Sequence, residues 1–236
     1  MSAAEQLRHH LARYDALRQH RDPAFRERLH RLQAFQARRL QHTHAALIAD
    51  PKYHDATTLF LTDIYGGIDL LPMAREIEHA LPMASRLLPD TVFATSAIAV
   101  DIMALTQELD EELTGWLFAD GGHAAPAIDD YVAAFRAQNR FADRERQMAL
   151  VRELGLGLDR YVRSRLIFTT FRMVRRPAHR YGLGTLYDFL ERGFAAMRPL
   201  GSTHELFERM THDELAILGR IAAGDPDPFL LRGKPL

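Results

Sequence analysis

Apolar residues recur at intervals of three and four along almost the whole chain, and no stretch alternates clearly between apolar and polar residues. In residues 23–49, for example, Phe25, Leu29, Leu32 and Phe35 fall on one face of a helix, because an α-helix turns by about 100° per residue. The 236 residues are 47% hydrophobic, which is enough to enclose a full core. The sequence therefore predicts an all-α protein, a single compact multi-helix domain of about eight to ten helices.

Prolines mark several expected helix ends. Asp22 and Pro23 have the residue types of an N-cap and a first helical position. Pro177 is expected to close a long helical stretch over 141–176. We expect the helical domain to cover residues 1–224. Residues 225–236 carry three prolines and little apolar surface, which predicts a Pro/Gly-rich C-terminal tail.

The long stretch over 141–176 is expected to break near Ser164 and Arg165. Before this point the apolar residues share one face, with arginines opposite. Beyond it Arg165, Arg172 and Arg176 fall where the apolar face was. A straight helix would place three guanidinium groups along its own buried stripe, which is costly unless each is paired. The phase therefore predicts a kink, a bulge or a turn; the alternative is a straight helix whose arginines meet an acidic surface.

Charge is segregated along the chain. Residues 1–50 carry nine Arg or Lys against five Asp or Glu, residues 51–130 carry three against fourteen, and residues 131–236 carry eighteen against twelve. The formal net charge is nevertheless only −1. The simplest interpretation is that the basic and acidic thirds pack on one another, and the alternative is that one basic surface faces a partner.

The sequence lacks the residues or motifs that several kinds of catalysis and binding need. There is no cysteine, which excludes thiolate nucleophiles and fits a reducing cytoplasm. No serine lies in a Gly-x-Ser-x-Gly elbow. The pairs Gly155/Gly157 and Gly182/Gly184 lack the third glycine and the lysine of nucleotide-binding loops. The longest uncharged apolar stretch, 91–100, is about half the length of a membrane span. We therefore expect a soluble, cytoplasmic protein.

Residues 59–65 (LFLTDIY) resemble the signature of the bacterial FFLEELY-motif family, whose members are of similar length. Phe60, Leu61 and Tyr65 match the signature outright, whereas Thr62 departs from it. Further segments also resemble that family, namely 38–50, 144–147 and 183–194. The family has no activity to carry over, so the resemblance implies a fold and a length but no chemistry. At helical spacing the signature itself indicates a short helix inserted into a core.

Two Glu-x-x-His pairs, Glu27/His30 and Glu76/His79, raise the alternative of a di-iron carboxylate site in a helical bundle. Such a site needs both pairs to point into the core. At about 100° per residue, both pairs instead point away from the apolar faces of their own helices. We therefore predict no tightly bound transition metal and no cofactor, and keep Glu76 and His79 only as weak metal candidates.

Three other residues, His204, Glu208 and His212, are spaced four apart and share one helix face that zinc could use. The apolar stripe of that helix is centred elsewhere, which favours a solvated polar face. The acidic run at 108–112 lacks the spacing of a calcium loop and is interpreted in the same way. A lone buried histidine that binds haem stays an open alternative.

The basic segment, residues 160–180, interleaves arginines with Leu, Ile and Phe. Its candidate binding residues are Arg165, Arg172, Arg175, Arg176 and Arg180. We expect this segment to dock on the acidic third. The alternatives are an acidic partner or anionic membrane surface, without spanning, and nucleic acid, which the near-neutral total charge disfavours.

The function that the sequence favours is non-enzymatic binding of another protein, or of an apolar small molecule between helices. The main alternative is a helical-bundle enzyme that depends on metal or haem. A peripheral membrane-surface protein that uses the basic segment is the third interpretation.

Overall fold

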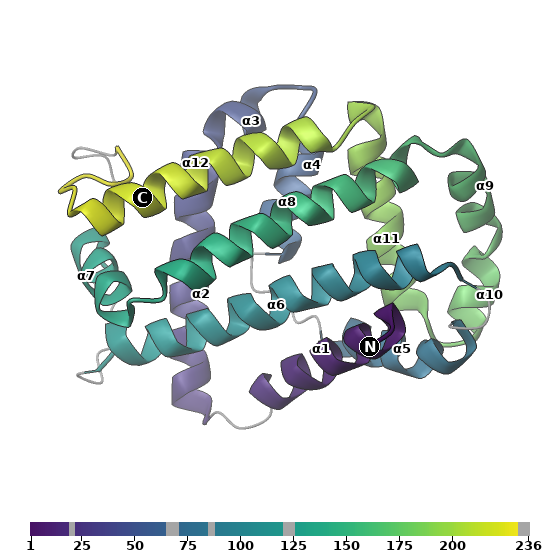
Figure 1. Cartoon of the computed structure of the whole chain (residues 1–236), viewed down its shortest axis with the longest axis horizontal. Coiled ribbons are helices and arrows are strands. Elements are labelled where there is room, and N and C mark those ends of the chain that lie inside the picture. The colour runs from purple at the N-terminus through teal and green to yellow at the C-terminus, as the bar shows by residue number, and fades with distance from the viewer. Residues whose placement is uncertain (19–21, 65–70, 85–87, 120–125, 231–236) are drawn as a thin grey trace.

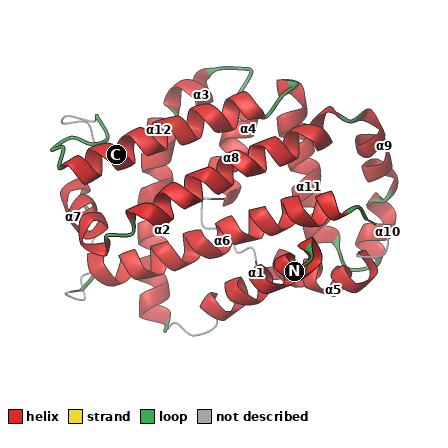
Figure 2. Cartoon of the chain, viewed as in Figure 1, coloured by secondary structure: helices red, strands yellow, loops and turns green. Residues whose placement is uncertain are grey.

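A computed structural model describes residues 1–18, 22–64, 71–84, 88–119 and 126–230 of the chain. Within these ranges it contains twelve α-helices and no strand, which confirms the all-α class (Figure 2). The helices are α1 (Ala3–Arg18), α2 (Pro23–Thr43), α3 (Ala45–Ala49), α4 (His54–Leu59), α5 (Leu71–Ala84), α6 (Asp90–Leu117), α7 (Ile128–Gln138), α8 (Phe141–Arg163), α9 (Arg165–Met173), α10 (Arg175–Arg180), α11 (Gly184–Met197) and α12 (His204–Ala223). A π-helical turn, η1 (Phe60–Ile64), follows α4, and a 3-10 turn, η2 (Arg198–Leu200), follows α11.

Four helices, α1, α6, α8 and α12, lie side by side on the viewed face of the molecule (Figure 1). Behind them α2 crosses near one end and α11 near the other, with α3 and α4 between. The short helices α9 and α10 lie beyond α11, at the end opposite α7. This arrangement leaves α9 and α10 at the periphery of the structure.

Local sequence signals explain several helix ends. Asp22 caps α2 by accepting a hydrogen bond from the Phe25 amide at 2.8 Å, as expected for an Asp-Pro start. The predicted break at Ser164 is confirmed: α8 ends at Arg163, Ser164 is extended (φ −83°, ψ 112°), and its hydroxyl accepts from the Ile167 amide at 3.2 Å. The expectation that Pro177 closes a helix is wrong. Pro177 lies in the first turn of α10, where its missing N–H is not needed.

The signature residues that the structure describes lie in the core. Phe60 and Leu61 are 3% and 1% exposed, and the Phe60 ring meets Phe207 edge to face, with centroids 5.2 Å apart. Thr62 is exposed, as the helical spacing predicts. Tyr65 lies outside the described residues. Phe60 of η1 therefore packs on α12, whereas α4 packs mainly on α11.

The chain after α12 buries more than its composition suggests. Phe229 is 7% exposed and packs against Tyr131, with ring centroids 6.1 Å apart. Arg220 donates to the Pro228 carbonyl at 2.7 Å, which holds this segment against α12. The prediction that residues after Asp225 have little to bury overlooked this single aromatic anchor.

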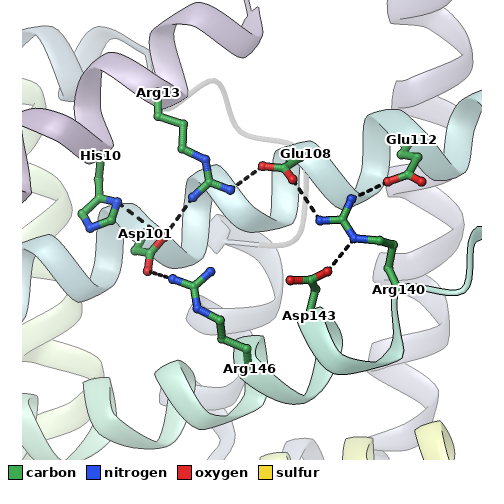
Figure 3. Close-up of polar contacts among 8 residues, drawn as sticks. All are labelled: His10, Arg13, Asp101, Glu108, Glu112, Arg140, Asp143 and Arg146. Atoms are coloured by element: carbon green, nitrogen blue, oxygen red, sulfur yellow. Dashed lines mark hydrogen bonds and ion pairs between the residues drawn. The ribbon is translucent and has the colours of Figure 1, made fainter.

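Charged side chains from three helices meet around Asp101 on α6 (Figure 3). Asp101 is 5% exposed and receives Arg13 of α1 at 3.1 Å and Arg146 of α8 at 2.5 Å. Arg13 also reaches Glu108. His10 approaches Asp101 at 3.4 Å; burial lowers the pKa of His10, although the Asp101 carboxylate opposes that shift. These pairs hold α1 and α8 on either side of α6.

Arg140, just before α8, joins three carboxylates (Figure 3). It donates to Asp143 at 2.5 Å, to Glu112 at 2.7 Å and to Glu108 at 3.0 Å. Burial would raise the pKa of Glu108, but hydrogen bonds from Arg13 and Arg140 lower it overall. The acidic third of the sequence thus pairs with basic residues from both other thirds, as the charge pattern predicts.

The interpretation of residues 108–112 as a solvated face is wrong. Asp110 and Glu111 are 2% and 5% exposed. Gln36 donates to Asp110 at 3.1 Å, and Gln107 donates to Glu111 at 2.9 Å. Amide donors on α2 and on α6 itself therefore make these buried carboxylates tolerable.

By length and composition alone, α6 is one helix in the described residues that could cross a membrane. Half of its most apolar window is buried inside the structure. Its sequence also carries the acidic residues that pair with α1 and α8 (Figure 3). In this fold α6 is one of the two inner helices of the four-helix layer, between α1 and α8, a position that also favours an apolar composition (Figure 1).

Candidate functional site

The two short helices at one end of the molecule, α9 and α10, contain no buried residue (Figure 1). Phe168 and Phe171 turn toward α11 and are half-buried. Leu166 and Met173 lie seven residues apart, which places them on one helix face, and they are 77% and 72% exposed. We call α9 and α10 together the basic arm. The basic arm therefore has exposed apolar side chains, Leu166 and Met173, in addition to the two phenylalanines that pack against α11.

All five predicted binding arginines lie on the basic arm and are exposed: Arg165, Arg172, Arg175, Arg176 and Arg180. The ion pairs of the arm within the described chain go to α11, from Arg175 to Glu191 at 3.5 Å and from His179 to Asp188 at 3.0 Å. Within the described residues these five arginines make no ion pair with the acidic third. The basic segment meets that third only at its start, where the Tyr161 hydroxyl lies 3.4 Å from Thr95 Oγ1. Arg13, Arg140, Arg144 and Arg146 pair with the acidic third instead.

A groove of about 490 Å³ lies between the basic arm, α11 and η2. Phe168 and Phe194 contribute rings to it, 6.0 Å apart and edge to face. The Arg198 guanidinium stacks over Phe168 at 3.9 Å, and Arg172 lies over the same ring at 6.0 Å. The groove therefore combines aromatic surface with two guanidinium groups.

The arm is fixed to α11 by aromatic stacking. Phe171 and Tyr187 lie parallel, with an interplanar angle of 4° and centroids 4.4 Å apart. The Tyr187 hydroxyl donates to the Phe171 carbonyl at 3.3 Å. Burial raises the pKa of Tyr187, and the nearby Glu191 carboxylate adds to this shift. This stacked contact between α9 and α11 lies at one edge of the groove, which Phe171 also lines.

The first Glu-x-x-His pair lies on the surface of α2. Glu27 and His30 are both exposed. Glu27 pairs with Arg31, one turn further along the same helix, at 2.5 Å. The two side chains therefore lie on the outward face of α2, as the phase of the apolar residues predicts.

The second Glu-x-x-His pair, on α5, is divided between two environments. His79 is exposed. Glu76 instead caps α11: its carboxylate accepts from the Leu186 amide at 2.8 Å and from the Thr185 amide at 3.2 Å. A carboxylate near a helix N-terminus stabilises the helix, and periodicity within α5 could not reveal that partner. The candidate metal ligands Glu76 and His79 are therefore corrected to a helix cap and an exposed side chain.

The second candidate metal face is solvated and divided among other partners. His204 lies 3.7 Å from Glu208, which is held by Arg152 at 2.7 Å. His212 is exposed and lies 3.4 Å from Asp213. In the part of the chain that the structure describes, no group of three or more His, Asp or Glu residues has the geometry of a metal site.

Sequence reasoning missed the α11 side of the groove. Phe194 and Arg198 have the same i, i+4 spacing as Phe168 and Arg172. This repeated Phe-x-x-x-Arg spacing could have predicted the arginine–aromatic pairs, because each arginine lies one helical turn from its phenylalanine. It does not reveal that Arg198 stacks on the other pair's ring, which depends on how α9 folds back.

A family model described as a domain of unknown function, DUF8198, matches residues 16–228. No curated protein and no solved structure matches the chain at a significant level. The match spans α2 through α12 and includes the basic arm and its groove.

Proposed function

Because the chain belongs to the DUF8198 family, whose function is unknown, we propose a function from geometry: it is a non-enzymatic binding protein whose basic arm and adjoining groove receive an acidic, partly apolar segment of another protein. The observation that carries the proposal is the arm itself. Five exposed arginines and exposed apolar residues lie on two helices that have no buried residue.

Charge supports an acidic partner. Of the five arginines, Arg175 pairs with Glu191, and no ion pair within the described chain occupies Arg165, Arg172, Arg176 or Arg180. Exposed arginines interact with carboxylates through paired hydrogen bonds, and arginine is enriched at protein interfaces. A partner segment with spaced Asp or Glu residues would complement this surface.

The groove supports a protein partner over a membrane. A flat lipid surface needs exposed apolar tips and positive charge, which Leu166, Met173 and the arginines supply. Binding to such a surface does not require a hollow of about 490 Å³ with an aromatic wall. An apolar side chain from a partner helix would fill such a hollow, as in recognition of a helix in a groove.

We also propose that the chain is one of the bacterial FFLEELY-motif proteins, on the basis of residues 59–65. Action in the cytoplasm is proposed with it, in keeping with the absence of cysteine. Core clusters that join helices distant in sequence support a single compact domain.

A peptide-display selection tests the proposal and does not require the partner to be identified first. A library of helical peptides is selected on the full chain, and enriched peptides are remeasured on variants. We expect enrichment of peptides that combine Asp or Glu with a bulky apolar residue. Ala195→Trp, which fills the groove from an exposed position on α11, should weaken them at least tenfold.

A matched control keeps the test specific. Gly219→Trp on the exposed side of α12 adds the same ring away from the groove and should leave binding unchanged. Enrichment of peptides without acidic residues, or equal binding by both variants, would contradict the proposal. Flotation of the protein with phosphatidylglycerol vesicles but not phosphatidylcholine vesicles, in the absence of peptide selection, would assign the arm to the membrane instead.

A further inference from the structure

A second hollow lies inside the helical layers, far from the basic arm. It holds about 50 Å³ and is lined by residues of α2, α6, α7, α8, α12 and the segment after α12. A single water needs about 10–15 Å³ of such volume, so the hollow has room for a group of a few heavy atoms. Its polar lining includes Arg39, Asp110, Arg144, Gln147 and Glu214.

The two arginines that line this hollow differ in how they are paired. Arg39 donates to Glu214, with Nη1 2.6 Å from Oε1. Burial would raise the pKa of Glu214, but Arg39 and His44 lower it to about 2, so this pair is ionised. The charge of Arg39 is thereby neutralised inside the hollow.

Within the described residues, Arg144 instead makes only a long ion pair, to Asp110. Its residue is 9% exposed, and neither Nε nor Nη2 has a hydrogen-bond partner within the described chain. The nearest carboxylate, Asp110, is 3.9 Å from Nη2, which is too long for a direct hydrogen bond. Phe135 covers the guanidinium at 5.2 Å. A buried charged donor left in this state is costly unless a further group satisfies it.

Nε and Nη2 form one edge of the guanidinium, the edge that binds a carboxylate side-on through two parallel hydrogen bonds. From this edge, its burial and the hollow beside it, we infer that the protein binds a small free carboxylate, of the size of formate or acetate, on Arg144. The volume of about 50 Å³ suits a ligand of this size, and no catalytic step is implied.

Asp110 is suited to share the site with such a ligand. Burial raises the pKa of Asp110, opposed by Arg144 and by hydrogen bonds from neighbouring glutamines. In its protonated form Asp110 leaves one positive charge in the hollow and offers an O–H donor to an incoming carboxylate. Gln36 holds Asp110 in place, with Nε2 donating to Oδ1 at 3.1 Å.

Sodium formate, acetate and butyrate, each compared with sodium chloride at the same ionic strength, provide the test. At about 0.1 M, formate or acetate should raise the melting temperature of the full chain by about 2–4 °C, and butyrate should not. Arg144→Met should abolish the rise. Arg152→Met, on the same helix but outside the hollow, should retain it.

Carbon-13-labelled acetate gives a second measurement on the unaltered protein, which decides the matter even when Arg144→Met fails to fold. We expect nuclear Overhauser contacts from the acetate methyl group to Met148 or Phe135, which line the hollow. No contact and no acetate-specific rise would overturn the inference and leave the hollow to water. A rise that Arg144→Met retains, or that butyrate equals, would also overturn it.

Discussion

Gly155 lets α8 and α12 approach more closely than a side chain would allow. A methyl group added there would lie 2.7 Å from both Cβ and Cγ of Phe207 and 2.9 Å from its Cδ2. Optimal carbon contacts are about 3.5–4.0 Å, so Gly155→Ala forces about 1 Å of overlap. Phe207 cannot easily yield, because it is 1% exposed and packs on Phe60.

The expected magnitude combines two opposed effects. Overpacking of a core costs about 1–3 kcal/mol, whereas replacing a helical glycine by alanine gains about 1 kcal/mol. Gly155→Ala should therefore lower the free energy of unfolding by up to about 2 kcal/mol. Gly219→Ala, where nothing lies within 4 Å of the new carbon, should raise it by about 0.5–1 kcal/mol.

Urea unfolding followed by far-ultraviolet circular dichroism measures both variants against the unaltered chain. The slopes should agree, so the midpoints can be compared directly. If Gly155→Ala proved as stable as Gly219→Ala, the close approach of α8 and α12 would be refuted.

Two further predictions concern pH and capping. The folded-state pKa of Glu214, about 2, lies below its ordinary value of 4.5, so this carboxylate stabilises the fold above pH 4.5 and the stabilisation is lost as pH falls toward 2. Glu214→Gln should flatten that part of a stability–pH profile, and an unchanged slope would contradict the Arg39 pairing. Ser164→Ala removes the cap of α9 and should cost about 1 kcal/mol. Ser164→Asp should keep most of this stability, and equal losses in both would argue against the cap.

The helices and the break at Ser164 could be predicted because their causes are local. Periodicity, an Asp-Pro start and the phase of Arg165 relative to the preceding apolar face are all visible within one segment. The same holds for the burial of Phe60 and Leu61.

The missed features depend on partners that are distant in sequence. Asp110 is tolerated in the core because Gln36 on another helix meets it, and Glu76 caps a helix that begins more than a hundred residues later. The charge pattern predicted that acidic and basic thirds would pair, but it could not choose among arginines. Arg13 and Arg140 face α6 because of how α1 and the start of α8 pack on it. Neither of these two segments alone shows that packing in its sequence.

Charge reversal on the basic arm tests most directly whether the arginines of this arm serve to bind a partner or to stabilise the fold. The variant Arg172→Glu/Arg176→Glu is compared with Arg26→Glu/Arg38→Glu, which changes the same charge on α2, away from the arm. For the arm variant we expect an unfolding free energy within about 0.5 kcal/mol of the unaltered chain and loss of the selected acidic peptide; the α2 variant should keep the peptide. A melting temperature that falls in the arm variant and recovers in high salt, or a peptide that still binds, would contradict a binding role for the arm.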